Sequence, residues 1–169
     1  MTTRSPERKC KDYERWWGDL CVDKNLQDEW LVRLNDLQAF TLVGICEGHC
    51  DRRPGSSGRF PHINLRLKEQ LLPGLANRWE ELRLAILNEV NRLFQIGDTN
   101  IDIELKFKLR AGRGRLIYRE DLTLRMRSFR ARDSEEMDTE TYNWFQESVE
   151  RVAKLNRIVL EWHRANKEA

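Results

Sequence analysis

The densest group of chemically capable side chains surrounds a polar segment at residues 47–61. Glu47 and His49 stand at its start, and His62 follows its end directly. A carboxylate and two imidazoles are the groups that general acid–base catalysis uses, and histidine is the side chain most easily tuned near neutral pH. Glu47, His49 and His62 are therefore the catalytic candidates of one hypothesis, a hydrolase or nuclease that works with or without a metal.

The same segment also suits a phosphate group. It is rich in Gly, Ser and Arg, so backbone amides can approach an anion, hydroxyls can donate and guanidiniums can bind it at two points. It matches neither of the two glycine-rich phosphate motifs and leads into a strand pattern rather than a helix. The candidate ligand-binding residues are Arg59, Asn64, Arg66, Arg125 and Arg127.

A third hypothesis places zinc in this region. The candidate ligands are Cys46, His49, Cys50 and His62, with Cys10 or Cys21 as alternatives for the last position. Four nitrogen or sulfur groups satisfy tetrahedral zinc, but this spacing is not that of a zinc finger or ribbon. The interpretation we favour is that the cysteines are reduced and behave as small buried hydrophobes.

Length and composition predict a single domain over residues 1–169. The chain is 40% hydrophobic and 34% charged, with a formal net charge of +2. Its longest apolar run, Phe40 to Cys46, is far shorter than the roughly 20 residues that span a bilayer. The charged amino terminus leads into no apolar stretch, so we expect no signal peptide and no membrane partner, and a cytoplasmic location.

Apolar periodicity predicts four helices. The first opens at Ser5-Pro6 and ends at Gly18, with Cys10, Tyr13 and Trp17 as its stripe, and Asn25 caps the second. A third helix starts at Pro73-Gly74 and stops at Gly97-Asp98. The fourth is long and runs from about Thr139 to about Ala165. Trp16 and Trp144 lie off these stripes, which is typical of contacts between copies in a homo-oligomer.

Alternation of apolar and polar residues predicts four strands. Phe40 to Cys46 is apolar on both faces, so we place it centrally in the sheet or covered on both sides. His62 to Lys68 alternates strictly. Ile101 to Arg110 and its return strand from Leu116 alternate around an Ala-Gly-Arg-Gly turn, which is typical of a long β-hairpin. Glu120 breaks the apolar parity and suggests a bulge or a strand end there.

Together these elements predict an α+β fold with about four strands in a largely antiparallel sheet. Its helices lie mainly on one face, with two N-terminal helices, a long C-terminal helix and a flexible loop at residues 47–61. The opposite, polar face is then basic. Glu104 to Arg132 carries a net charge of +7, whereas Asp133 to Ala169 carries −4.

The sequence thus supports function hypotheses of different classes. The first is a binding module for a phosphate-bearing ligand, a nucleotide or nucleic acid, held between the 47–61 loop and the basic sheet face. The second is the hydrolase or nuclease, so the enzyme question stays open. The third is a structural or interaction domain without a small-molecule site, whose outer face is merely solvated or meets an acidic protein. Apart from Phe129, the strands lack the exposed aromatics on which sheet-based RNA readers stack bases.

Overall fold

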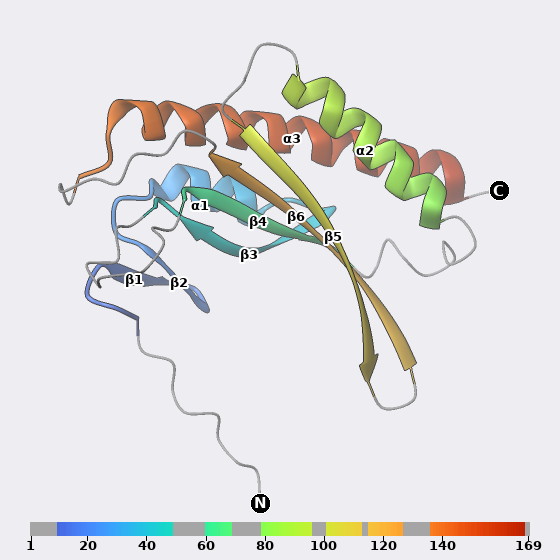
Figure 1. The fold of residues 1–169 in the computed structure, drawn as a ribbon, viewed down its shortest axis with the longest axis horizontal. Helices are drawn as coiled ribbons and strands as arrows, with labels where there is room; N and C mark the ends of the chain where they lie inside the picture. Colours follow the sequence, from blue (N-terminus) through green and yellow to red (C-terminus); the bar gives the residue numbers. More distant parts are fainter. Residues whose placement is uncertain are drawn as a thin grey trace, which may run out of the picture.

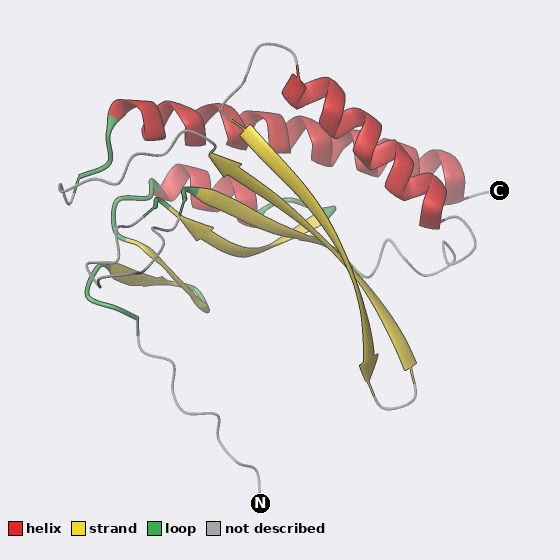
Figure 2. Cartoon of the chain, in the orientation of Figure 1, coloured by secondary structure: helices red, strands yellow, loops and turns green. Residues whose placement is uncertain are grey.

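A computed structural model describes residues 10–48, 60–68, 79–95, 101–112, 115–126 and 136–167. Figure 1 shows the arrangement of the elements and Figure 2 the secondary structure. In chain order the elements are β1 (Glu14–Trp17), β2 (Leu20–Asp23), α1 (Asp28–Asn35), β3 (Phe40–Cys46), β4 (His62–Leu67), α2 (Trp79–Gln95), β5 (Ile101–Gly112), β6 (Arg115–Met126) and α3 (Thr139–Lys167).

The strands form antiparallel sheets. β1 and β2 make a two-stranded ribbon, and the other four strands pair in the order β3-β4-β6-β5. The expected α+β class, the antiparallel pairing and the long C-terminal helix are therefore confirmed. The β5–β6 hairpin extends beyond the part that pairs with β4, as Figure 1 shows, because β4 reaches only as far as Asp121 on β6.

The expected first helix is wrong over the residues that the structure describes. The chain instead forms the β1–β2 hairpin, in which Trp17 faces Leu20 across a two-residue turn, Gly18-Asp19. Gly18 adopts φ +56°, a left-handed conformation that suits a tight hairpin turn and costs glycine little. The start proposed at Ser5-Pro6 lies outside the described residues. The second helix exists as α1, but Gln27 rather than Asn25 occupies its N-cap.

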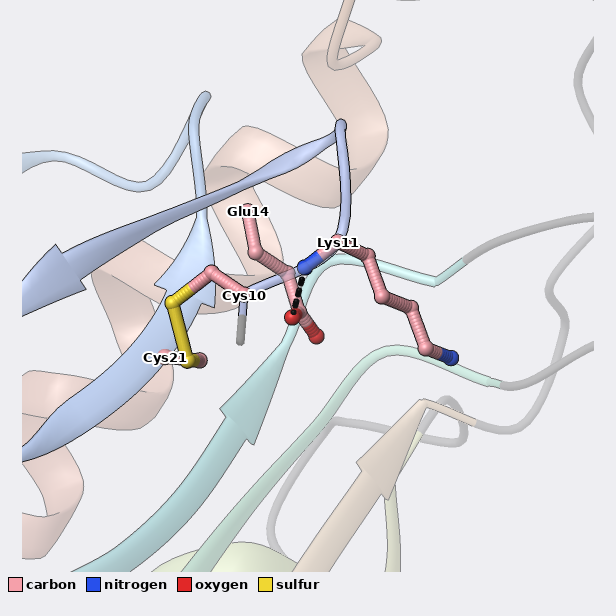
Figure 3. Close-up of a disulfide and its surroundings, with 4 residues drawn as sticks. All are labelled: Cys10, Lys11, Glu14 and Cys21. Atoms are coloured by element: carbon pink, nitrogen blue, oxygen red, sulfur yellow. Dashed lines mark hydrogen bonds between the residues drawn. A yellow bond between two sulfur atoms is a disulfide. The ribbon is translucent and has the colours of Figure 1, made fainter. Parts of the chain in front are cut away.

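The expectation of reduced cysteines is wrong for two of the four. Cys10 and Cys21 form a disulfide that ties the chain before β1 to β2, as Figure 3 shows. Cys46 lies outside this disulfide and is buried, as expected of a small hydrophobe. Cys50 lies outside the described residues.

The core forms because each amphipathic element turns its apolar side inward. On β4 and β6 the buried residues alternate with polar ones, as the period-2 pattern requires. They join the buried sides of α1 and α3 in one cluster, and Figure 1 shows both helices on the same side of the sheet. The central members are Trp30, Leu31, Leu34, Ile63, Leu65, Leu122, Leu124, Phe145, Val149, Val152 and Leu155.

Two expectations about the strands need correction. β3 lies at the edge of the four-stranded sheet rather than in its centre, although α1 and β2 both contact it. The register shifts between Leu42 and Gly44 on β3, which is where the structure has its β-bulge. The bulge expected at Glu120 is absent from the described ladder, because Phe107 faces Glu120 in an unshifted register.

The tryptophans also differ from expectation. Trp16 and Trp17 lie on β1 instead of a helix. Trp144 is only 4% exposed and packs edge-on against Phe145, with ring centroids 4.9 Å apart, so it belongs to the core and offers no contact to a second copy. Trp16 is 53% exposed. None of the helices in the described part of the chain has the length and apolar character needed to cross a bilayer.

Candidate functional site

Pairing of β4 with β6 brings three rows of polar residues together on one sheet face. His62 faces Arg125, Asn64 faces Thr123, and Arg66 faces Asp121. These six residues alternate with the buried apolar residues of the same strands, so they occupy the face turned away from the core. Alternation alone predicts that four candidate residues share the polar sheet face. The β4–β6 register places all four on it: His62, Asn64, Arg66 and Arg125.

The row formed by Arg66 and Asp121 is an internal ion pair. Arg66 donates from Nε to Asp121 Oδ1 at 2.8 Å and from Nη2 to Oδ2 at 3.3 Å. Asp121 is only 6% exposed, so its charge needs this partner. Arg66 is thus already bound at two points by a carboxylate, which reduces its capacity to bind an external anion.

The middle row is held by a side-chain hydrogen bond. Thr123 donates from Oγ1 to Asn64 Oδ1 at 3.2 Å. Since the amide oxygen is the acceptor here, the Asn64 side chain turns its Nδ2 group, with two donors, away from Thr123. Both residues are half-buried. This row therefore presents hydrogen-bond donors rather than charge.

The last row stands at the end of the strands where residues 47–61 connect β3 to β4. Met126 N donates to Pro61 O at 2.9 Å, so His62 and Arg125 form a non-hydrogen-bonded pair, the type in which facing side chains come closest. The His62 ring places Nδ1 2.9 Å from Phe60 O. Because a carbonyl only accepts, Nδ1 carries the proton, and in the neutral ring the lone pair lies on Nε2.

Glu47 follows β3 and is buried, with 7% exposure. Its Oε1 accepts from Asn25 Nδ2 at 3.1 Å, and its backbone amide donates to Asp23 Oδ2 at 2.6 Å. Two carboxyl side chains and an amide thus meet where the β1–β2 hairpin docks against the end of β3. Local sequence pattern brings neither Asp23 nor Asn25 to Glu47, because it predicts that Gly18 ends a helix and not that it turns a hairpin.

The structure describes only two of the four candidate zinc ligands. Cys46 faces His62 in the β3–β4 register, and Gly48 N donates to Cys46 Sγ at 3.4 Å. His49 and Cys50, its other two ligands, lie outside the described residues, as do the ligand candidates Arg59 and Arg127. Two of the four zinc candidates are thus neighbours, and the zinc site itself stays a prediction.

An open groove of about 650 Å³ lies between the β1–β2 hairpin and the starts of α1 and α3. Its basic residues already have protein partners. Arg15 pairs with Asp28 and donates to Leu26 O at 3.1 Å, and Lys24 donates to Asp12 O. The groove is lined by Arg15, Lys24, Asn25, Leu26, Gln27, Asp28, Met137 and Tyr142. These contacts of Arg15 and Lys24 therefore hold the start of α1 and the β1–β2 hairpin in place.

Comparison with known proteins adds no identification. Neither a family model, nor a curated protein, nor a solved structure matches this chain.

Proposed function

We propose that this chain is a binding module for a phosphate-bearing ligand, a nucleotide or nucleic acid, and that Arg125, His62 and Asn64 bind the phosphate. The observation that supports this most is the β4–β6 register, which places Arg125 beside His62 and one row from Asn64. A guanidinium and an amide are donors that phosphate oxygens accept from, and the imidazole becomes a third donor, through Nε2, when the ring is protonated.

Charge within this face favours Arg125 over Arg66 as the main contact. Arg66 is half-buried and held by Asp121 at two points, whereas Arg125 is exposed near the end of β6. In this proposal Arg125 supplies the positive charge that attracts the phosphate, and hydrogen bonds from His62 and Asn64 orient it. Arg59 and Arg127, both outside the described residues, add charge from the adjoining segments.

The β5–β6 ladder favours a nucleic acid over a mononucleotide. Beyond the end of β4 it continues as a two-stranded ribbon, in which Lys108 faces Arg119. A two-stranded ribbon fits the major groove of a duplex. The basic residues of the ladder beyond the end of β4 are Lys108, Arg110, Arg115 and Arg119.

The test is fluorescence anisotropy with a labelled DNA duplex, a labelled single-stranded RNA and a labelled adenosine triphosphate, each over a range of salt. We expect Arg125→Ala to weaken binding about tenfold, the loss of one charge-assisted contact. Arg164→Ala is the matched control, because Arg164 is exposed on α3. Binding to a nucleic acid should fall steeply between about 50 and 200 mM salt.

Two results would overturn the proposal. One is that none of the three probes binds at low salt. The other is that Arg125→Ala and Arg164→Ala weaken binding equally, which would mean that the contact is unspecific attraction to a basic protein. Binding of adenosine triphosphate alone, with the same loss in Arg125→Ala, keeps the phosphate site and selects the nucleotide.

A further inference from the structure

The β1–β2 hairpin carries a second group of chemically capable side chains, independent of the sheet face. Cys10, Glu14 and Cys21 each offer one ligand atom, and these atoms all lie within 4.8 Å of one another. All three residues are half-buried, so small molecules can reach them. Figure 3 shows the carboxyl group of Glu14 near the two sulfur atoms, which the structure joins in a disulfide.

The hairpin itself positions two of these groups. Glu14 faces Asp23 and Trp16 faces Cys21, so Glu14 and Cys21 are diagonal neighbours on the same face of the ribbon. This relation is set by the backbone ladder and the Gly18-Asp19 turn, neither of which includes the sulfur–sulfur bond. Cys10 comes from the segment just before β1.

The Glu14 carboxyl group is already oriented. Lys11 N donates to Glu14 Oε2 at 2.8 Å, and the dashed line in Figure 3 marks this bond. Hydrogen bonds of this kind hold a ligating carboxylate in place and are typical of the surroundings of metal sites. With Oε2 held, Oε1 is the oxygen suited to bind a cation.

We propose that Cys10, Cys21 and Glu14 form a zinc site when the disulfide is reduced, so that the hairpin alternates between a disulfide and a metal centre. Two thiolates and one carboxylate are zinc ligands, and three protein ligands leave the fourth tetrahedral position to water. The two states exclude each other, because the thiolate is the zinc-binding form of cysteine and the disulfide contains none.

Conversion of the disulfide into the zinc-binding form takes two electrons and two protons. A dithiol reductant attacks one sulfur, breaks the sulfur–sulfur bond through a mixed disulfide and leaves as its own disulfide, so two electrons and two protons reach Cys10 and Cys21. Zn²⁺ then displaces the two thiol protons and forms two zinc–sulfur bonds, while Glu14 contributes an oxygen. In the reverse direction a disulfide oxidant takes two electrons from the two thiolates and two protons from water to become a dithiol, the Cys10–Cys21 bond re-forms and Zn²⁺ is released. The redox state of the compartment therefore decides which form exists.

The test uses the full chain, with and without a phosphine reductant, which opens the disulfide by becoming a phosphine oxide. Each sample receives Zn²⁺ alone, is desalted and is analysed for bound zinc. Co²⁺ is then substituted, because thiolate coordination gives an absorption band that carboxylates do not. We expect one equivalent of zinc in the reduced protein and none at this site in the oxidised protein.

Variants assign the site. We expect Cys21→Ser to abolish the thiolate band. Glu14→Gln should weaken zinc binding by at least about tenfold, because losing even a residue that only hydrogen-bonds to a metal ligand lowers metal affinity by that factor. Glu29→Gln, at an exposed position in the first turn of α1, is the control for Glu14. Glu14→Gln leaves both cysteines intact, so the proposal stays testable if Cys21→Ser fails to fold.

Two outcomes would overturn the proposal. The first is that reduction does not increase bound zinc. The second is that zinc binding survives Cys21→Ser and Glu14→Gln but disappears in Cys46→Ser, which would place the metal beside His62 on the sheet. Neither outcome bears on the proposed phosphate site, which is tested separately with Arg125→Ala.

Discussion

Arg66 and Asp121 bind each other at two points across β4 and β6, with Nε–Oδ1 and Nη2–Oδ2 distances of 2.8 and 3.3 Å. The side chain of Arg66 is 29% exposed and that of Asp121 is 9% exposed, so the pair is partly withdrawn from water. Such a pair fixes the spacing of the two strands on the polar face. The arginines of this face therefore differ in role, since Arg66 maintains the sheet and Arg125 is the proposed ligand contact.

The first prediction is that Asp121→Ala destabilises the fold by about 2 kcal/mol, because Arg66 is left half-buried without its counter-ion. Urea unfolding measures this free energy. Glu147→Ala is the control. Glu147 is exposed on α3, and its Oε2 lies 3.7 Å from Arg151 Nη2. A surface ion pair of this kind stabilises a fold by less than about 1 kcal/mol. Equal losses in the two variants would show that the Arg66–Asp121 pair contributes no more than a surface pair does.

A second prediction concerns a hydrogen bond that joins α3 to the chain before β3. Asn156 Oδ1 accepts from Ala39 N at 2.8 Å, and both residues are buried. We expect Asn156→Ala to cost about 1–3 kcal/mol, since it leaves a buried backbone donor without a partner. Asn166→Ala, which removes a bond to Trp162 O near the end of α3, should cost clearly less in the same thermal and urea unfolding experiments. A loss no larger than that of the control would contradict this account.

Alternation was the reliable guide to the sheet and to most of the candidate site. Residues 62–67 and 122–126 alternate without a break, so their inward and outward parities could be predicted, and with them the shared face of Asn64 and Arg125. The ion pair of Arg66 could not be predicted, because it depends on which rows of β4 and β6 face each other. A one-residue change of register would give it another partner.

The N-terminal hairpin shows why the rest failed. Cys10, Tyr13 and Trp17 recur at helical spacing, and this periodicity masked the Gly18-Asp19 turn. The disulfide and the docking of Asp23 beside Glu47 are contacts between segments, which local pattern does not contain. Trp144 was misplaced for a similar reason: α3 buries a wider arc than its main stripe because α1 also packs against it.

The third prediction concerns the disulfide in the absence of metal. Cys10 and Cys21 are 11 positions apart, and closing a loop of this size stabilises a fold by about 3 kcal/mol in the chain-entropy model. We therefore expect a phosphine reductant and a chelator together to lower the free energy of unfolding by up to about this amount. The Cys46→Ser variant should lose as much on reduction as the native chain does. If reduction leaves unfolding unchanged, the disulfide does not constrain the chain.

The last prediction concerns acid stability and the pair between α1 and α3. Arg33 donates from Nη1 to Glu150 Oε1 at 2.7 Å. This hydrogen bond, with the positive charge of Arg33, lowers the pKa of Glu150, and Glu150 raises the pKa of Arg33. Arginine stays protonated throughout, so only the carboxyl group links this pair to pH.

A carboxyl whose pKa is lower in the folded chain stabilises the fold above its unfolded value, about 4.3 for glutamate, and loses this effect as the pH falls through the lowered value. We therefore expect Glu150→Gln to be slightly less stable than the native chain at pH 7, and the difference to shrink below about pH 4.3. Urea unfolding over a pH series tests this, with Glu161→Gln, an exposed position on α3, as the control. A difference that is constant with pH, or that grows in acid, would mean that the Arg33–Glu150 pair does not stabilise the packing of α1 on α3.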